Sequence, residues 1–307
     1  MKHLLSLESL TREEILGILA LGSDMKANRG HLARHPLRHR CWGMIFTKSS
    51  TRTRVSFEVG IRELGGDALF LNSNDLQLGR GEPIEDTARV LGRMLHGVVI
   101  RTFAQSDVER FAQFSGLPTV NALTDAEHPC QILADLYTIQ EKLGDWRGKK
   151  ICYLGDGACN VPASWLWAAA RLGEFELVIA APPKYQPAAE LIARLGPLAN
   201  VRCEEDPRAA VEGANVLYTD VWVSMGMEAD AGTRMTDLAG YGIDAALVAR
   251  ARPNALVMHC LPAYRGKEIS ADVLEAHADT IFSQAENRLH VQKAILSLLA
   301  DAHAAVV

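Results

Sequence analysis

Several features are missing from this sequence of 307 residues, and each absence narrows the class of protein. No apolar run approaches the roughly 18 residues that a membrane-spanning helix needs, and too few apolar residues precede Glu8 for a signal-peptide core. Basic residues form no block or stripe, so we do not expect a nucleic-acid partner. The six cysteines contain no C-x-x-C pair, which favours free thiols over disulfides or a metal site. We therefore expect a cytoplasmic protein without a metal or a membrane anchor.

Complete nucleotide-binding motifs are also missing. The phosphate-loop pattern G-x-x-x-x-G-K-S/T does not occur anywhere in the chain. Gly155-Asp-Gly-Ala-Cys-Asn160 follows a predicted strand and begins like a dinucleotide-binding turn, but Asn160 stands where that motif has its third glycine. The expected acidic residue is also absent after the next strand. We therefore expect no nicotinamide cofactor, and no other cofactor is indicated.

Short apolar runs of β-type residues alternate with amphipathic helical patterns along the whole chain. After a first helix that begins with the capping-box pattern Thr11–Glu14, the strand candidates are Trp42–Thr47, Ala68–Asn72, Val98–Phe103 and Thr119–Leu123. Helical patterns follow at Arg54–Leu64, Ile84–Met94, Val108–Phe114 and Gln131–Leu143. This alternation predicts parallel sheets that are covered on both faces by helices.

A second series of strands begins near Lys149. Its candidates are Ile151–Leu154, Leu177–Ala180, Val201–Glu204, Val216–Asp220, Leu256–His259 and Thr280–Phe282, followed by a last helix from Leu289 to about Ala300. We expect an α/β protein of two domains, each with a mostly parallel sheet flanked by helices, and an active site in the cleft between them. The predicted domains are residues 1–145 and 146–288, with a C-terminal helix at 289–307 that packs back on the first.

The strongest candidate site is Ser50-Thr-Arg-Thr-Arg54, which follows an apolar strand and opens a helix. Free N–H groups and the helix dipole attract anions to such a position, and Arg52 can bind phosphate through two hydrogen bonds. Ser and Thr also cap ordinary helices, and arginine is common on surfaces. The concentration of hydroxyl and guanidinium groups within five residues favours a phosphate site.

These five residues resemble the carbamoyl-phosphate signature shared by aspartate and ornithine carbamoyltransferases. Five further motifs that resemble the family occur in order, at residues 75–83, 128–131, 220–226, 259–262 and 285–288. The resemblance covers nearly the whole chain. It implies transfer of the carbamoyl group of carbamoyl phosphate to the side-chain amine of L-ornithine, giving L-citrulline and phosphate in arginine biosynthesis.

The resemblance also assigns roles to residues that composition alone would not single out. It implies that Arg101, His128, Asp220 and Cys260 are catalytic. Without the resemblance, Arg101 would be read as a surface residue and Cys260 as a buried core thiol. His128 and Asp220 would each be read as a helix cap. It implies that carbamoyl phosphate contacts Ser50, Thr51, Arg52, Thr53, Gln77, Arg101, His128, Gln131, Cys260, Leu261 and Arg288. In the homotrimer that the family implies, Gln77 would reach the carbamoyl phosphate of a neighbouring subunit.

The implied ornithine site contains Asn160, Asp220, Ser224 and Met225. The family usually has two asparagines where this chain has Cys159 followed by Asn160, a departure that concerns local loop packing. The alternatives are a sister enzyme that uses aspartate, putrescine or acetylated ornithine, a silent anion-binding regulatory protein, and a dehydrogenase. Asp220 and Cys260 suit an amine better than a second carboxylate, and Ser224 suits an acceptor with an α-carboxylate.

Overall fold

The structure, a computed structural model, describes residues 1–72, 81–224 and 226–304. The chain forms two compact units. The first contains Met1–Tyr137 together with Glu286–Val307, and the second contains Thr138–Ala285. Within the described ranges, no helix combines the length and the apolar character that crossing a membrane would require.

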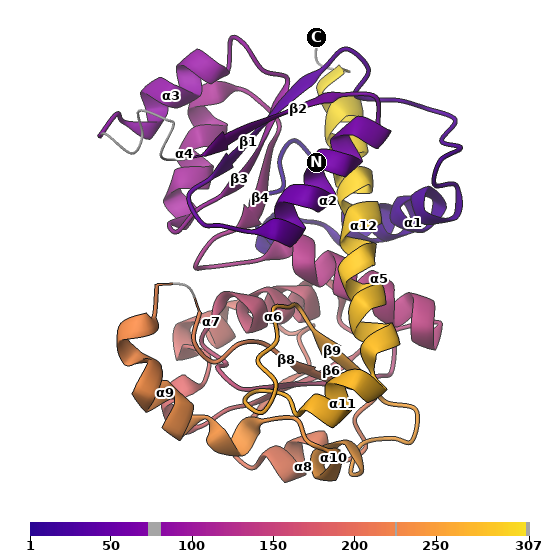
Figure 1. Cartoon of the computed structure of the whole chain (residues 1–307), viewed down its shortest axis with the longest axis vertical. Helices are drawn as coiled ribbons and strands as arrows, with labels where there is room; N and C mark the ends of the chain where they lie inside the picture. The colour runs from indigo at the N-terminus through magenta and orange to yellow at the C-terminus, as the bar shows by residue number, and fades with distance from the viewer. Residues whose placement is uncertain (73–80, 225, 305–307) are drawn as a thin grey trace. The chain divides into compact units, whose positions relative to one another are not determined.

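The first unit contains a four-stranded parallel sheet in the order β2-β1-β3-β4 (Figure 1). The strands are β1 (Cys41–Phe46), β2 (Asp67–Asn72), β3 (Gly97–Arg101) and β4 (Thr119–Leu123). The chain goes from β1 outward to β2 and then returns to the other side of β1 for β3. Such a reversal separates the loops that follow β1 and β3, and ligands of α/β sheets bind at this point, beyond the carboxyl ends of the strands.

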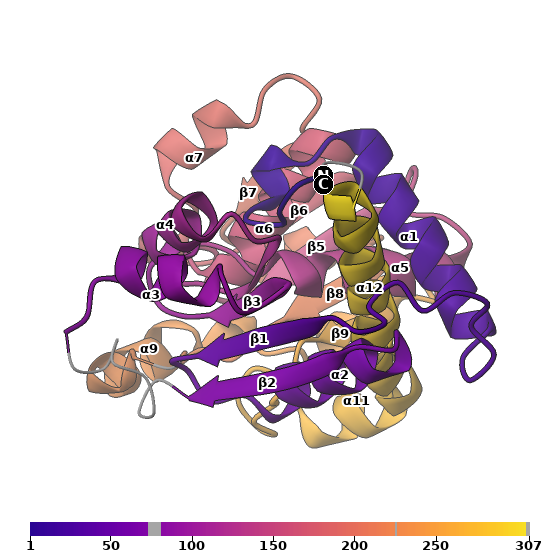
Figure 2. The ribbon, with the colours of Figure 1, turned by 90° about the horizontal axis from the view of Figure 1, so that it is seen from above.

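Helices cover both faces of this sheet. They are α1 (Arg12–Ala27), α2 (Thr51–Glu63), α3 (Ile84–Leu91), α4 (Gln105–Ser115), and parts of α5 (Pro129–Leu143) and α12 (Ala278–Ala304). Helices α3 and α4 lie on one face, where Phe111 packs with Ile45 and Ile100, and α2 lies on the other (Figures 1 and 2). The capping box predicted for α1 is confirmed, because Thr11 and Glu14 each accept a hydrogen bond from the backbone N–H of the other.

Helix α12 contacts α2 near both ends of α2. At the N-terminal end, Arg288 donates to Thr53 Oγ1 over 2.8 Å. At the other end, the fully buried Lys293 donates to Glu63 Oε2 over 2.6 Å. A Cβ atom on Gly60 would lie only 3.2 Å from the Lys293 side chain, so glycine permits the close approach of the two helices.

The second unit contains a five-stranded parallel sheet in the order β7-β6-β5-β8-β9. Its strands are β5 (Lys150–Leu154), β6 (Glu176–Ala180), β7 (Val201–Glu204), β8 (Val216–Thr219) and β9 (Leu256–His259). Here the direction of chain progress reverses between β5 and β8. The loops after β5, β8 and β9 therefore leave from three neighbouring strand ends beside the switch point.

Alternate residues of these strands face different helices. Cys152 and Leu217 belong to the core that includes α8 (Pro207–Val211), α10 (Ala245–Val248) and α11 (Ala271–Ala276). Tyr218 instead contacts Trp165 of α6 (Asn160–Leu172), with ring centroids 5.8 Å apart. The remaining helices are α7 (Ala189–Arg194) and α9 (Ala231–Asp237).

One predicted strand is wrong. Thr280–Phe282 belongs to α12, which begins at Ala278 and not at Leu289. A β-branched pair followed by an aromatic residue is typical of a strand, but the buried positions Ile281, Gln284 and Arg288 follow the spacing of a helix. The other predicted strands are confirmed, with ends shifted by no more than a residue or two.

Candidate active site

The phosphate motif opens α2 immediately beyond the carboxyl end of β1. Ser50 is the N-cap, and its Oγ accepts a hydrogen bond from the backbone N–H of Thr53 over 3.2 Å. Thr51 is exposed, Arg52 is half-buried and Thr53 is fully buried. The first turn contains no acidic residue. Because the first N–H groups of a helix have no partner within it, this end of α2 favours an anion.

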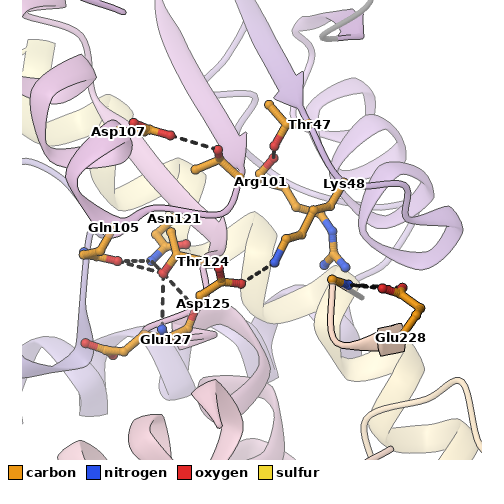
Figure 3. A network of polar contacts seen from close by, with 12 residues as sticks. Thr47, Lys48, Arg101, Gln105, Asp107, Asn121, Thr124, Asp125, Glu127 and Glu228 are labelled. Carbon is orange, nitrogen blue, oxygen red and sulfur yellow. Dashed lines mark hydrogen bonds and ion pairs between the residues drawn. The ribbon is translucent and has the colours of Figure 1, made fainter. Parts of the chain in front are cut away.

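The loop between β1 and α2 is held by contacts with the ends of β3 and β4. The backbone N–H of Thr47 donates to the Arg101 carbonyl over 2.9 Å. Lys48 is 5% exposed, pairs with Asp125 and lies over the Phe103 ring, 4.2 Å from its centroid. Figure 3 shows Lys48 and Arg101 extending from adjacent strand ends. Lys48 was not among the residues predicted from the sequence, although a lysine at a strand end before a phosphate motif is a usable signal.

Three side chains predicted from the sequence form a buried, positively charged cluster in the first unit. Arg101 ends β3 at 9% exposure, and Arg288 and His128 are each 4% exposed. Burial lowers the pKa of His128 well below its usual range, and the positive charges of Arg288 and Arg101 lower it further. The imidazole is therefore neutral and can donate one N–H to a carbonyl oxygen without carrying charge. Arg288 lies well inside α12, although the predicted last helix began only at the next residue, Leu289.

His128 directly precedes α5, and Gln131 follows it by three residues on the same helical face. Gln131 is 1% exposed, and its Nε2 donates to Asp135 Oδ1 over 2.9 Å. Its Oε1 accepts no hydrogen bond from any residue that the structure describes. Between them, Cys130 donates to the Asn121 carbonyl, and burial raises the pKa of its thiol to about 12, so it is an inert packing residue.

In the second unit, the loops after β8 and β9 bring Asp220 and Cys260 together. Cys260 Sγ donates to Asp220 Oδ1 over 2.8 Å, and the Val221 N–H donates to the same oxygen over 2.7 Å. Asp220 is 8% exposed. Burial raises the pKa of its carboxyl group, although His259 and the two hydrogen bonds act in the opposite direction. A buried carboxylate beside a thiol fits a cationic or hydrogen-bond-donating ligand.

His259 holds the backbone beside this pair. Its Nδ1 accepts the Leu261 N–H over 2.8 Å, and its Nε2 lies 3.2 Å from Oε1 of the fully buried Glu268. Leu261 has a left-handed backbone, with φ of 58°. Asp220, His259 and Cys260 place one ligand atom each within 4.8 Å of one another, a spacing that a metal ion could use. Both nitrogens of His259 are already engaged, which favours a hydrogen-bonding role for the other two.

The remaining predicted residues stand on loops after β5 and β8. Asn160 is half-buried and is the first residue of α6, while Ser224 is half-buried in the loop after β8. Cys159 caps α6 and donates to the Asp156 carbonyl over 3.2 Å, so the departure from the family pattern is a local packing contact. Gln77 and Met225 lie outside the described residues.

The loop that carries Ser224 is held by a residue that was not predicted from the sequence. Arg234 of α9 donates to the Trp222 carbonyl over 2.6 Å and forms a partly buried ion pair with Asp156. These residues are distant in sequence and match no local pattern, so nothing in the chain alone pointed to the pairing.

Comparison with known proteins divides the chain into two matched domains. Residues 2–141 match the carbamoyl-phosphate-binding domain described for aspartate and ornithine carbamoyltransferases, and residues 147–299 match the aspartate- or ornithine-binding domain. The chain is 56% identical over 304 residues to an ornithine carbamoyltransferase of Akkermansia muciniphila, covering 98% of this chain and 99% of that protein. It is 47% identical to the anabolic ornithine carbamoyltransferase of Pseudomonas aeruginosa, covering 98% and 97%.

Solved structures agree. The ornithine carbamoyltransferase of Pyrococcus furiosus superposes with a TM-score of 0.92 at 43% identity, over 98% of this chain and 97% of that one. The anabolic enzyme of Campylobacter jejuni gives a TM-score of 0.92 at 41% identity, over 98% and 100%. The chain belongs to the aspartate/ornithine carbamoyltransferase family.

Proposed function

We propose that this chain transfers the carbamoyl group of carbamoyl phosphate to the side-chain amine of L-ornithine, forming L-citrulline and phosphate. The observation that carries the proposal is the buried cluster of Thr53, Arg101, His128 and Arg288 beside the N-terminus of α2. It combines a phosphate-binding helix end with a neutral imidazole, the two features needed to bind an acyl phosphate and polarise its carbonyl. The names of the relatives support ornithine as the acceptor.

In this proposal, residues 1–145 form the carbamoyl-phosphate domain, and the part of α12 from Leu289 to Ala304 packs back on it. Ser50, Thr51, Arg52 and Thr53 hold the phosphate, together with Arg101, Arg288 and a neighbour's Gln77. Arg101, Thr53 and His128 donate to the carbonyl oxygen, where negative charge develops as the carbon becomes tetrahedral. The carbamoyl NH₂ is bound by Gln131, Leu261 and Cys260.

Residues 146–288 form the ornithine domain. Asp220 binds an amino group of ornithine through a charge-assisted hydrogen bond, and Cys260 orients the attacking amine. Asn160, Ser224 and Met225 bind the amino-acid end of the substrate. The amine must attack in its neutral form, although an unperturbed alkylamine has a pKa of about 10.4.

The reaction proceeds by direct transfer. The amine nitrogen bonds to the carbonyl carbon, the bond from that carbon to the bridging phosphate oxygen breaks, and the leaving phosphate takes the amine proton. Positioning and stabilisation of the oxyanion supply the rate enhancement, and no covalent enzyme intermediate is required.

We further propose a cytoplasmic homotrimer that acts in arginine biosynthesis. The name of the Pseudomonas aeruginosa relative supports the biosynthetic direction. Exposed apolar side chains support assembly, because Val55 of α2 is 54% exposed and Leu69 of the edge strand β2 is 45% exposed. Apolar side chains at a sheet edge are suited to contact with another chain.

A parallel assay of acceptors tests the function. We expect carbamoyl phosphate with ornithine to give citrulline with a specificity constant well above those for putrescine, aspartate and acetylated ornithine. A higher constant for one of these amines would overturn the ornithine assignment and leave carbamoyl transfer standing. No transfer to any of them, with carbamoyl phosphate still bound in calorimetry, would favour an anion-binding role.

A further inference from the structure

The side-chain amide of Gln131 is held in one orientation, with its nitrogen toward Asp135 and its oxygen away from it. An amide carries an acceptor and a donor of nearly the same size, so its orientation is set by its hydrogen-bond partners. Here Nε2 donates to Asp135 Oδ1 over 2.9 Å, and both residues lie on α5, one helical turn apart. Because Asp135 accepts at that oxygen, the alternative orientation would place two acceptors against each other. The Gln131 oxygen is consequently forced away from Asp135.

This oxygen is a buried acceptor without a donor among the residues that the structure describes. Gln131 is 1% exposed and Asp135 is fully buried, and no described residue donates to Gln131 Oε1. Leaving a buried acceptor unpaired is unfavourable, so the site selects a ligand group that carries N–H at this position. His128 lies three residues earlier on the same side of the helix start, so the acceptor stands next to the group that binds the carbonyl oxygen.

We propose that Asp135 is a specificity-determining positioning residue, which fixes the Gln131 amide so that the enzyme distinguishes a carbamoyl group from an acetyl group. The inference rests on the proposed function, because it assumes that the acyl phosphate is bound beside His128. Carbamoyl phosphate and acetyl phosphate share the phosphate and the carbonyl. They differ in the third substituent, which is an NH₂ donor in one and a methyl group in the other. Only the NH₂ group satisfies the oriented Gln131 oxygen.

The test compares the two acyl phosphates in Asp135→Asn, a replacement of nearly identical size. The new amide can donate to Gln131 Oε1, which allows the Gln131 amide to turn and present NH₂ to the ligand. Binding of carbamoyl phosphate, measured by calorimetry, should then weaken by about tenfold to a hundredfold, whereas binding of acetyl phosphate should change by less than about threefold. The ratio of the two dissociation constants is the decisive quantity.

Ile132→Val is the matched control, since it removes one methyl group from a fully buried neighbour on α5 without changing any polar group. It should leave the ratio at its wild-type value. Equal weakening of both ligands in Asp135→Asn would mean a merely structural role, and unchanged binding of both would mean that Asp135 does not set the orientation. Either result overturns the proposal.

Gln131→Met supplies an independent arm if Asp135→Asn does not fold. This variant removes the acceptor and keeps the length of the side chain, so it should also lose the preference for carbamoyl phosphate. Retention of the wild-type ratio would overturn the proposal. Failure of the wild-type protein to bind carbamoyl phosphate would instead overturn the proposed function, so the two failures are distinguishable.

Discussion

Some buried polar side chains of this protein are positioned to bind a ligand and lower the stability of the unliganded fold. Asp220 is the clearest case. Its carboxyl group receives hydrogen bonds from Cys260 and Val221 but is removed from water, and burial raises its pKa. An acid whose pKa is higher in the folded state stabilises the fold fully only below its unfolded pKa. That contribution is lost as the pH rises through the folded pKa, so the ionised group destabilises the free enzyme relative to an uncharged side chain.

Replacing Asp220 therefore separates stability from activity. Asp220→Asn should lose about tenfold to a hundredfold in the specificity constant for ornithine, because a charge-assisted hydrogen bond is worth roughly 1.5–3 kcal/mol. Its unliganded melting temperature at neutral pH should equal or exceed that of the wild type, and calorimetry should show unchanged binding of carbamoyl phosphate. A variant that melts lower and keeps its ornithine kinetics would mean that Asp220 is a structural cap.

His128 predicts a dependence on pH with a definite sign. Its folded-state pKa is lowered by burial and by two arginines, so the stability that it contributes is present above an unfolded pKa of about 6.5 and decreases as the pH falls. Urea unfolding of the wild type and of His128→Gln at about pH 8 and pH 5.5 measures this contribution. The loss of stability between the two pH values should be smaller in the variant by about 1 kcal/mol. Exposed His31, changed to Gln, is the control and should leave the loss unchanged.

At the scale of residues, the sequence predicts those that act at strand ends and helix starts, because phosphate and oxyanion chemistry needs particular groups there. It does not reveal the residues that orient them. Asp135 and Glu268 are ordinary acidic residues in the sequence, and only the fold shows that they contact Gln131 and His259. Their partners are chosen by packing, which no local pattern encodes.

At the scale of elements, sequence patterns predicted that α12 exists but placed its start too late. Strand propensity at Thr280–Phe282 competes there with a helical spacing of buried residues, and the helix prevails because its apolar face continues into the following turns. The same helix contacts α2 through Arg288 near the N-terminal end of α2 and through Lys293 at its C-terminal end. These two contacts fix the direction of α2 and therefore the position of its N-terminus.

The contact between Lys293 and Glu63 predicts an asymmetric response to mutation. Among the described residues, Glu63→Met would leave the buried Lys293 ammonium group with one remaining acceptor, the Met25 carbonyl at 3.5 Å, and should destabilise the protein by about 3–5 kcal/mol. Lys293→Met keeps the apolar stem and leaves Glu63 paired with Arg29 at the surface, so it should cost less than about 1.5 kcal/mol. Denaturant unfolding of both variants checks this order, and equal losses would contradict it.

At the scale of the whole molecule, both sheets were predictable as parallel and helix-covered, because apolar strand runs alternate with amphipathic helices. Strand order was not predictable, since it depends on which strand the chain returns to after β2 and after β7. The two reversals place the phosphate motif and Arg101 at one switch point, and the loops of Asn160, Asp220 and Cys260 beside the other.

The proposed homotrimer can be tested through shared sites. Arg52→Ala and Gln77→Ala chains should each be nearly inactive alone, since the first lacks its own phosphate contact and the second cannot complete a neighbour's site. Mixing them under conditions of subunit exchange should restore part of the citrulline formation through hybrid sites. A monomer in sedimentation, or efficient exchange without any rescue, would count against a shared site.

The interrupted first unit has a consequence for synthesis. The chain leaves this unit at Tyr137 and returns only at Glu286, whereas the second unit is one continuous segment. A nascent chain on the ribosome can therefore complete its second unit while the first still lacks Arg288 and Lys293, which follow that unit in the sequence. Domains fold as units during translation, so the competence to bind an acyl phosphate should appear abruptly once the second segment of the first unit has been translated. A prematurely terminated chain would carry the phosphate motif of α2 without the helix that aligns it, and would remain a substrate for proteolysis.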